Sequence, residues 1–376
     1  MKLKDVYITA LAKFLPNQPV TNDEMESHLG MIGGKPSRAR RIVLRNNGIK
    51  TRYYSLKEDG SFSHSNAGMV VEAINQLGIP SKDIELLSCG TSATDQTLPS
   101  HTAMVHGLLN SPMEIISPSG ACCSGIHAMK FGFLSVKSGE CSNAVTSGSE
   151  FISPMMMARN FESESSSESE LESNPFIGFE KDFLRWMLSD GAGAALMQDK
   201  PNENGLSLKI EWIESRSYAN EYETCMYSAA DKNDDGSIKS WKEFEPTQWL
   251  DHSVFAMKQD VKLLGSTIVP LGGKYLTEIA ERRKLDVSSV DYFLPHLSSN
   301  FFRKQVYEQL ASDGMEITED KWYTNLVEVG NVGSASIYIM LEELFNSGKL
   351  KKGQKLLLMV PESARFSYAY VLLTVC

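Results

Sequence analysis

Strand-like runs alternate with helical patterns along most of this chain, and that alternation limits the fold more than any other feature of the sequence. Apolar runs of strand length occupy residues 6–11, 84–89, 113–116, 143–147, 193–197, 206–213, 292–294 and 355–360. Helical periodicity covers residues 65–77, 101–109, 255–283 with an interruption near Pro270, 300–310 and 336–344. Alternating strands and helices predict a layered α/β architecture with buried sheets.

A faint internal repeat suggests two related halves. A Cys-Ser-Gly-Ile segment at residues 123–126 is followed by a helical pattern, a Ser-Gly pair and a strand. A Gly-Ser-Ala-Ser segment at residues 333–336 is followed by the same series. The chain of 376 residues is also about twice the length of a typical domain. We therefore expect an N-terminal half, residues 1–185, and a C-terminal half, residues 186–376.

The composition excludes several classes of protein. Hydrophobic residues make up 42% of the chain, which is enough for a large buried core. The net charge of −10 argues against a general binder of nucleic acid or anionic membranes. The N-terminus lacks the apolar stretch of a signal peptide, and no segment approaches the length of a membrane span. We therefore expect a cytoplasmic protein.

No metal site is expected from the sequence. The six cysteines are scattered and form neither a disulfide framework nor a zinc-like set with histidine. Residues 231–242 imitate a calcium-binding loop, but Lys242 stands at the twelfth position, where such a loop needs a bidentate glutamate. A turn built from asparagine, aspartate and glycine is the simpler interpretation.

Two segments stand out by their charge. Residues 162–175 are acidic and rich in serine, which predicts an inserted, exposed loop or a lid. Arg38, Arg40 and Arg41 belong to a basic patch at residues 35–41 that could receive an acidic partner or a phosphate. A solvated loop or helix face explains this patch equally well.

A run of small residues at positions 119–125 carries the best candidate nucleophile. It reads Ser-Gly-Ala-Cys-Cys-Ser-Gly and stands just before a helical pattern over residues 126–136. Small neighbours let a substrate approach the sulfur, and a helix N-terminus lowers the pKa of a thiol and stabilises an adjacent anion. This environment suits attack on a thioester or carbonyl, although a lone cysteine is more often a buried structural residue.

Two polar residues offer partners for that cysteine. His296 follows a short apolar strand, where catalytic groups at a sheet edge usually lie, whereas no strand end positions its competitor His127. Asn331 lies in a tight turn that opens a helix, where it either caps the backbone or presents its amide N–H to a carbonyl oxygen. A third turn at residues 188–195 lacks the Lys-Ser/Thr of a phosphate-binding loop, which excludes nucleotide hydrolysis.

Together these motifs resemble those of the β-ketoacyl-acyl-carrier-protein synthase III family, within the thiolase-like condensing enzymes, over nearly the whole chain. The matching segments are Asn-Gly-Ile-Lys-Thr-Arg at 47–52, Ala-Cys-Cys-Ser-Gly at 121–125, Asp-Gly-Ala-Gly-Ala-Ala at 190–195, Pro-His at 295–296 and Gly-Asn-Val-Gly-Ser-Ala-Ser at 330–336. The resemblance implies a five-layered αβαβα thiolase-like fold, built from two duplicated α/β halves, and a homodimer.

The resemblance also implies roles for individual residues. Cys123 would take an acyl group from the phosphopantetheine of an acyl carrier protein or from coenzyme A, and its backbone N–H would form part of the oxyanion hole. His296 and Asn331 would donate hydrogen bonds to the carbonyl oxygen of a second thioester and stabilise the enolate that forms when a malonyl-type extender loses CO₂. The enolate would then attack the acyl-cysteine. No tightly bound cofactor is implied.

Some segments depart from the family. Ser-Ala-Arg-Phe at residues 363–366 replaces its C-terminal glycine-rich turn and puts Ala364 at the second oxyanion position. The segment that helps to hold the adenine of coenzyme A is absent, which favours a carrier protein as donor. The chain looks most like the ketosynthases that build dialkylresorcinol lipids, where a β-ketoacyl thioester extends the chain and ring closure follows. Met155, Met156 and Met157 would line an acyl tunnel or belong to the ordinary core.

Two other functions stay open at this point. The same fold could transfer an acyl group to an oxygen or nitrogen acceptor, which needs the cysteine and the histidine but no carbon nucleophile. A non-catalytic subunit that shapes another ketosynthase is a further alternative, and the intact Cys123, His296 and Asn331 argue against it.

Overall fold

The computed structural model describes residues 3–37, 40–161 and 184–376. The α-helices in these residues are α1 (Met25–Leu29), α2 (Arg40–Asn47), α3 (Asn66–Asn75), α4 (His101–Leu109), α5 (Cys123–Ser138), α9 (Val261–Arg283), α10 (Arg303–Ser312), α11 (Leu326–Val329) and α12 (Ser336–Asn346). The strands of the main sheet, in their order of pairing, are β13 (Tyr292–Pro295), β14 (Lys355–Glu362), β15 (Ser367–Val375), β8 (Leu208–Ser217), β1 (Tyr7–Phe14), β7 (Gly191–Gln198), β6 (Asn143–Glu150), β4 (Leu86–Thr91) and β5 (Glu114–Ile116). Short ladders join β2 (Val20–Thr21) to β3 (Thr51–Arg52), β9 (Met226–Tyr227) to β12 (Lys258–Gln259) and β10 (Ala230–Lys232) to β11 (Ile238–Ser240).

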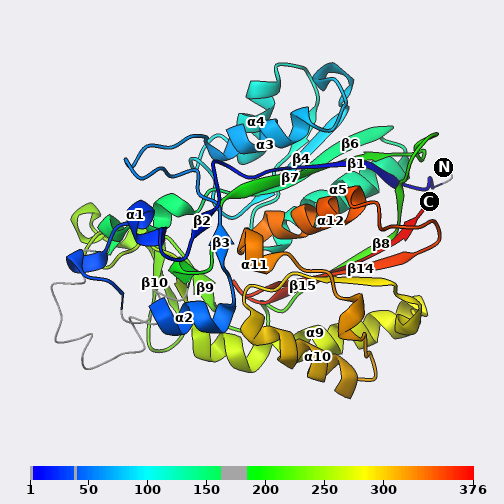
Figure 1. Cartoon of the computed structure of the whole chain (residues 1–376). Helices are drawn as coiled ribbons and strands as arrows, with labels where there is room; N and C mark the ends of the chain where they lie inside the picture. The colour runs from blue at the N-terminus through cyan, green and yellow to red at the C-terminus, as the bar shows by residue number, and fades with distance from the viewer. Residues whose placement is uncertain (1–2, 38–39, 162–183) are drawn as a thin grey trace.

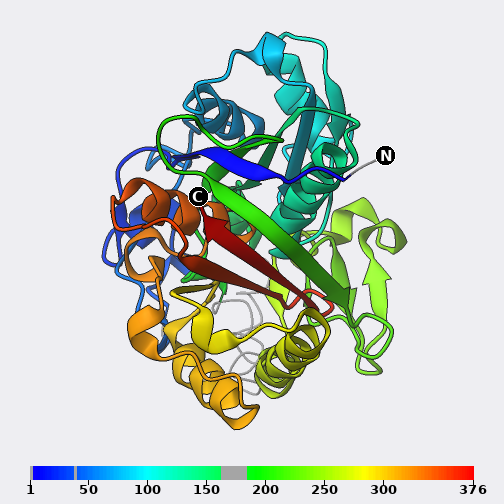
Figure 2. The same ribbon diagram turned by 90° about the vertical axis from the view of Figure 1, so that its right-hand side faces the viewer.

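Helices and sheet alternate in five layers (Figure 1). Helices α3 and α4 cover one outer face, and α9 and α10 cover the opposite face. Between the two parts of the sheet lie α5 and α12, whose side chains are buried along most of each helix. Strand β8 connects the two parts, because it pairs with β1 on one side and with β15 on the other (Figure 2). The predicted αβαβα arrangement is confirmed.

The two parts of the sheet repeat one pairing pattern. In the first part β4 and β6 are parallel, and β7 and β1 follow in antiparallel order. In the second part β13 and β14 are parallel, and β15 and β8 follow in antiparallel order. Strand β7 follows residue 185 in the chain, yet it belongs to the first part. The sheet of the N-terminal half therefore extends past the boundary that we expected between residues 185 and 186.

A very close backbone contact fixes the centre of the molecule. A Cβ atom on Gly125 of α5 would lie 2.4 Å from the carbonyl oxygen of Ser334, and one on Gly148 of β6 would lie 2.2 Å from the same oxygen. Only glycine permits such an approach. The start of α5, the strand β6 and the turn before α12 are therefore packed backbone against backbone.

Helix α9 passes through Pro270 without a break, so the predicted interruption is wrong. A proline in a helix removes one backbone hydrogen bond. Two buried hydroxyls hold the backbone on either side of it: Tyr368 donates to the carbonyl of Ile268, and Tyr370 donates to that of Gly272 at 3.0 Å. The helix also begins at Val261, because the residues before it form β12 and a turn rather than helix.

The structure describes only one of the two segments that have an unusual composition. Residues 162–175, which we expected to form a loop or lid, lie outside the described residues. Residues 231–242 contain the hairpin β10–β11, closed by the predicted turn with a hydrogen bond from the N–H of Gly236 to the carbonyl of Asn233. Across residues 3–37, 40–161 and 184–376, no group of three or more His, Cys, Asp or Glu side chains is arranged to hold a metal ion. In the same residues no helix is long and apolar enough to cross a bilayer.

Asp190 ties together three segments around the start of β7. Its carboxylate accepts hydrogen bonds from the backbone N–H groups of Ser55 (2.8 Å), Ile152 (2.7 Å) and Ser153 (2.9 Å), and from the Ser153 hydroxyl. The side chain is buried, and this burial raises the pKa of the carboxyl group to about 6. Asp190 is therefore the polar anchor of these loops.

Replacing Asp190 with alanine should destabilise the fold. Three buried N–H groups would lose their acceptor, and each unsatisfied group costs about 1–3 kcal/mol, so we expect a loss of about 3 kcal/mol or more in the free energy of unfolding. Urea unfolding of the Asp190→Ala variant measures this loss. Asp199→Asn is the matched control, since it removes only a surface ion pair with Lys4 and should cost less than about 1 kcal/mol. Equal effects of the two substitutions would contradict the anchoring role.

Candidate active site

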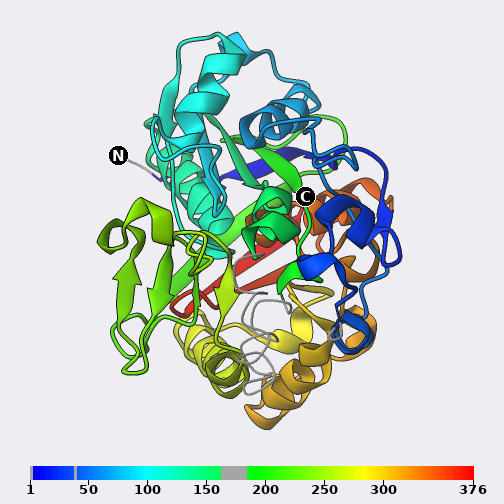
Figure 3. The same ribbon diagram turned by 90° about the vertical axis from the view of Figure 1, so that its left-hand side faces the viewer.

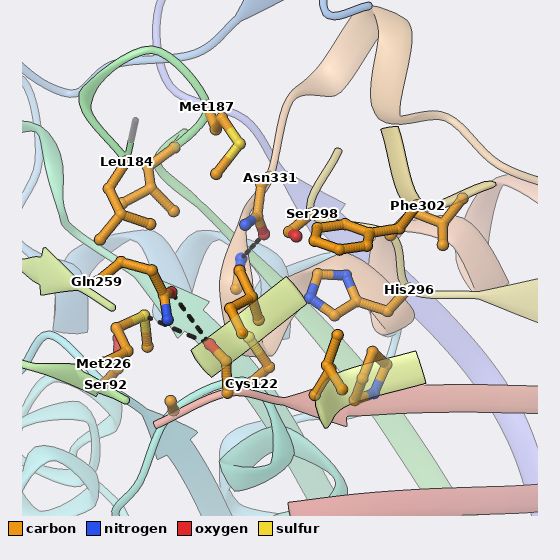
Figure 4. A pocket seen from close by; sticks show the side chains of 18 of the residues that line it. Ser92, Cys122, Leu184, Met187, Met226, Gln259, His296, Ser298, Phe302 and Asn331 are labelled. Carbon is orange, nitrogen blue, oxygen red and sulfur yellow. Dashed lines mark hydrogen bonds between the residues drawn. The ribbon is translucent and has the colours of Figure 1, made fainter. Parts of the chain in front are cut away.

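A pocket of ≈ 880 Å³, counted together with its opening to solvent, lies at the ends of strands β6, β13 and β14 (Figure 4). Its polar wall includes Ser92, Cys122, Glu150, His296 and Asn331. The carboxyl ends of parallel strands and the start of a buried helix meet here, which is where ligands bind in α/β sheets. The rest of the wall is mainly apolar. Its side chains include Leu184, Met187, Ile268, Phe302, Val306 and Met359.

Of the two adjacent cysteines, Cys122 is the one that lines the pocket. It stands immediately before the first residue of α5, whereas Cys123 is the first helical residue and is completely buried. The sulfur of Cys123 donates to the carbonyl of Val360 at 3.4 Å. The structure therefore brings Cys122, and not the expected Cys123, together with His296 and Asn331.

The thiol of Cys122 lies in an environment that disfavours its charged form. Burial is the main cause of its raised pKa, and the nearby carboxylates of Glu362 and Glu150 raise it further. The helix N-terminus acts in the opposite direction. A thiol in this site is protonated at rest and needs a proton acceptor when it reacts.

His296 is positioned by the second parallel strand pair. It follows β13, and its backbone N–H donates to the carbonyl of Met359 on the neighbouring β14 at 2.8 Å. The side chain is buried, and the loss of solvation lowers the pKa of the imidazole to about 4. His296 is therefore neutral near pH 7, with one ring N–H available as a donor.

Asn331 lies on the facing wall, in the turn between α11 and α12. Its side-chain oxygen accepts a hydrogen bond from the N–H of Gly333 at 2.9 Å. Its backbone is held by Met187 and Ser189, through bonds of 3.0 and 2.9 Å. With the oxygen engaged, the amide NH₂ is the group left to face the pocket. Cys122, His296 and Asn331 converge on the same space in Figure 4.

Glu150, the last residue of β6, is a buried carboxylate on the pocket wall. It accepts hydrogen bonds from the N–H of Ser334 (3.0 Å) and from the hydroxyl of Ser92 (2.6 Å). Burial raises its pKa to about 7, although these hydrogen bonds act to lower it. Glu150 is thus a weakly acidic group that changes charge near neutral pH.

Glu362, the last residue of β14, holds the turn that leads into α5 and contains the two cysteines. Its carboxylate accepts the backbone N–H groups of Ala121 (3.1 Å) and Cys123 (2.9 Å), and burial raises its pKa. Neither Glu150 nor Glu362 was predicted from the sequence. The signal was present, since each is a carboxylate at the carboxyl end of an otherwise buried strand.

The expected oxyanion hole is not arranged as the sequence suggested. The N–H of Cys123 is already donated to Glu362, and Ala364 does not line the pocket. The carbonyl of Ala364 instead accepts the N–H groups of Cys225 and Met226. Its neighbour Ser363 is the residue of this turn that reaches the pocket wall.

The methionine run predicted to line an acyl tunnel packs into the core instead. Met156 is buried, and Met155 and Met157 pack against the same hydrophobic cluster, away from the pocket wall. Different methionines line the pocket, among them Met226 and Met257. These two belong to the segment that carries the hairpin β10–β11, which forms a lobe beside the main sheet in Figure 3. Sequence periodicity contained no signal for this contribution.

The basic patch is only partly available for a partner. Arg38 lies outside the described residues. Arg40 is engaged in ion pairs with Glu26 at 2.7 Å and Asp23 at 3.2 Å. Arg41, the first exposed residue after it on α2, is the remaining member of the predicted carrier-binding set.

Several known proteins are similar to this chain. Residues 280–373 match the family described as 3-oxoacyl-[acyl-carrier-protein (ACP)] synthase III C terminal. The chain is 25% identical to β-ketoacyl-[acyl-carrier-protein] synthase III of Clostridium perfringens over 358 residues, or 95% of each chain. It is 22% identical to the enzyme of the same name from Chlorobaculum tepidum, over 94% of each chain.

Solved structures share the fold. A tetronic acid condensing enzyme superposes with a TM-score of 0.76 and 18% identity, over 98% of this chain and 99% of that chain. Xanthomonas campestris OleA with bound lauric acid and lauroyl-CoA gives 0.72 and 19%, over 99% of each chain. The 3-oxoacyl-[acyl-carrier-protein] synthase III of Aquifex aeolicus gives 0.69 and 19%, over 98% of this chain and 99% of that one. The chain therefore has the thiolase-like fold, and its similarity over nearly its whole length to β-ketoacyl-acyl-carrier-protein synthase III enzymes makes it a synthase III-like acyltransferase.

Proposed function

We propose that this enzyme forms a carbon–carbon bond by Claisen condensation, with the acyl group held on Cys122. One observation carries the proposal: a single pocket contains a thiol at the start of a buried helix, a neutral imidazole and a carboxamide NH₂. The thiol can hold an acyl group, and the two nitrogen donors can bind the oxygen of an enolate. Simple acyl transfer to oxygen or nitrogen forms no enolate and does not need the carboxamide donor of Asn331.

In the first half-reaction, the sulfur of Cys122 attacks the carbonyl carbon of an acyl thioester. The tetrahedral oxyanion needs fixed donors. The backbone N–H groups of Cys122 and Ser363 have no hydrogen-bond partner among the described residues, and we assign them this role in place of Cys123 and Ala364. Collapse of the intermediate leaves the acyl group on Cys122, and the thiolate of the donor leaves as a thiol after taking up the proton that Cys122 loses.

In the second half-reaction, a second thioester forms an enolate that attacks the acyl-cysteine. His296 and Asn331 donate to its carbonyl oxygen, where negative charge develops. Neutral donors in a site with little water stabilise such a charge without having to reorganise. The new carbon–carbon bond forms as the bond between carbon and Cys122 sulfur breaks.

The apolar part of the pocket suits a fatty acyl chain. Ile268 and Val269 of α9, Val306 of α10 and Met359 of β14 lie along it. A smaller cavity of ≈ 180 Å³ continues past Val306 between the two helices. The end of a longer acyl chain could lie in this smaller cavity.

We extend this assignment to the acyl donor, the oligomeric state and the pathway. An acyl carrier protein or coenzyme A delivers the acyl group, and the enzyme acts as a homodimer in specialised lipid or polyketide biosynthesis of the dialkylresorcinol type. Among the structural neighbours are a tetronic acid condensing enzyme and an OleA protein with lauroyl-CoA bound, which supports specialised and lipid substrates.

Cys122→Ala should abolish the covalent acyl adduct, and Cys123→Ala should keep it. The first substitution removes the only one of the two thiols that faces the pocket, whereas the second removes a sulfur that faces the core. Intact-protein mass spectrometry after incubation with a panel of acyl-carrier-protein and acyl-CoA thioesters measures the adduct and identifies the donor. The reverse result would return the role of nucleophile to Cys123.

His296→Ala and Asn331→Ala should leave acylation intact and slow condensation by about 10²–10³-fold each, the usual effect of losing one oxyanion donor. Single-turnover assays that start from the preformed acyl-enzyme separate the two half-reactions. If either variant condensed at the wild-type rate, that residue would not stabilise the enolate. Esters or amides as products would instead support the alternative acyltransferase.

Val306→Phe should shorten the acyl chains that the enzyme accepts. The added ring volume would close the passage to the smaller cavity, because a packed wall of α9 and β14 side chains cannot move aside cheaply. The measurement is the adduct on Cys122 as a function of chain length. Short chains should load as before, and an unchanged limit would place the chain elsewhere.

A further inference from the structure

The connection between β14 and β15 carries one of the two oxyanion donors assigned above. Strand β14 ends at Glu362 and β15 begins at Ser367, so residues 363–366 lie outside both strands. The strand ladder therefore does not aim the backbone N–H of Ser363. A group outside these two strands has to hold it in the direction of the oxyanion.

Glu362 brings this donor close to the nucleophile but does not fix its direction. The carboxylate of Glu362 accepts the N–H groups of Ala121 and Cys123, the two neighbours of Cys122. Ser363 is the next residue of the chain, so the N–H groups of Cys122 and Ser363 belong to adjoining segments. The peptide plane between Glu362 and Ser363 can still turn, because the two dihedral angles beside a planar peptide are soft.

The lobe, residues 218–260 between β8 and α9, holds the later part of this turn (Figure 3). Three backbone hydrogen bonds join the two segments. They run from the N–H groups of Cys225 (2.9 Å) and Met226 (3.2 Å) to the carbonyl of Ala364, and from the N–H of Tyr218 (2.8 Å) to the carbonyl of Phe366. The backbone that follows Ser363 is thus fixed by the lobe.

Gln259, the last residue of β12, holds Ser363 itself. The hydroxyl of Ser363 donates to the side-chain oxygen of Gln259 at 3.2 Å. Gln259 lines the pocket and is only 3% exposed. Among the described residues, the other acceptor that this hydroxyl reaches is the sulfur of Met226 at 3.9 Å, which is a weak one. Gln259 and Met226 lie next to each other in Figure 4.

The orientation of the Gln259 amide is determined by Cys225. Its NH₂ group donates to the carbonyl of Cys225 at 3.2 Å and to the sulfur of the same residue at 3.0 Å. A carbonyl can only accept, so the NH₂ group has to face Cys225, and the side-chain oxygen is left for Ser363. A closed ring of hydrogen bonds results, which runs from Ser363 through Gln259 and Cys225 to Ala364 and closes through the chain.

Accepting the condensing function proposed above, we propose that Gln259 is a positioning residue that aims the backbone N–H of Ser363 at the oxyanion, so that the lobe completes the oxyanion hole. Gln259 does not bind the oxyanion itself, because its NH₂ group is engaged by Cys225. Its effect is to keep the donor still. A fixed donor stabilises developing charge without reorganising, and a displacement of about 1 Å can cost about 10²-fold in rate.

Gln259→Leu removes both hydrogen bonds and nearly keeps the side-chain volume. The measurement is the single-turnover rate of adduct formation on Cys122 with octanoyl-pantetheine, or with the thioester that loads best in the panel above. We expect the saturating rate to fall about 10-fold or more, short of the 10²–10³-fold loss of a whole donor. The half-saturating concentration should change little, because the substitution misaligns the donor rather than the binding surface.

Ser363→Ala tests the same hydrogen bond from its other end and keeps the backbone N–H in the chain. It should slow acylation as much as Gln259→Leu does. The double variant should be no slower than either single variant, because both substitutions remove one shared interaction. Ser363→Thr retains the hydroxyl and should recover part of the rate. Additive losses, or a wild-type rate in either single variant, would overturn the proposal.

The infrared spectrum of the acyl-enzyme gives a readout that a merely structural role would not move. Hydrogen bonds to a carbonyl oxygen lower its stretching frequency, and a ¹³C label on the acyl carbonyl separates this band from the protein background. The band should lie at higher frequency in Gln259→Leu and Ser363→Ala than in wild type. A smaller amount of acyl-enzyme with an unchanged band position would contradict positioning of the donor.

Gln248→Leu is the matched control, since it makes the same change at an exposed residue of the lobe. It should alter neither the rate nor the band, and an effect equal to that of Gln259→Leu would overturn the specific role of Gln259. Failure of the proposed function would appear in wild type, as the absence of any adduct on Cys122. Failure of the positioning role would appear as a wild-type adduct that both variants form at the wild-type rate.

Discussion

Two buried carboxylates connect the halves of this molecule and hold the two turns that lead into the central helices α5 and α12. Glu362 ends a strand of the second part of the sheet and accepts backbone N–H groups at the start of α5, which packs on the first part. Glu150 ends a strand of the first part and accepts the N–H of Ser334 at the turn into α12. Each half therefore provides a carboxylate that accepts backbone N–H groups at the turn leading into the other half's central helix.

This reciprocal arrangement also sets the electrostatics of the site. Carboxylates occupy positions near helix N-termini that otherwise attract anions. Both are buried, both have a raised pKa, and together they disfavour ionisation of the Cys122 thiol. With a neutral imidazole at His296, the described lining residues of the pocket offer hydrogen-bond donors but include no lysine or arginine.

The sequence was sufficient for the architecture and for part of the site. Strand and helix periodicity predicted the layers, and two short motifs identified His296 and Asn331, because each follows a strand or turn that exposes its side chain. The choice between Cys122 and Cys123 depended on one residue of register at the start of a helix. A shift by one residue turns a side chain by about 100° around the axis, which moves it from pocket to core. No composition or spacing contains that information.

The adjacent cysteines and the two buried carboxylates differ within each pair in whether they reach the pocket. In each pair, one member lines the pocket and the other does not. Cys123 and Glu362 satisfy each other through the backbone and are closed to substrate. Cys122 is the residue before Cys123, and Glu150 ends β6 in the other part of the sheet; both line the pocket. The bonds between Glu362 and the turn before α5 hold the backbone around Cys122 in place, and fixed geometry of this kind is what electrostatic stabilisation of an enolate requires.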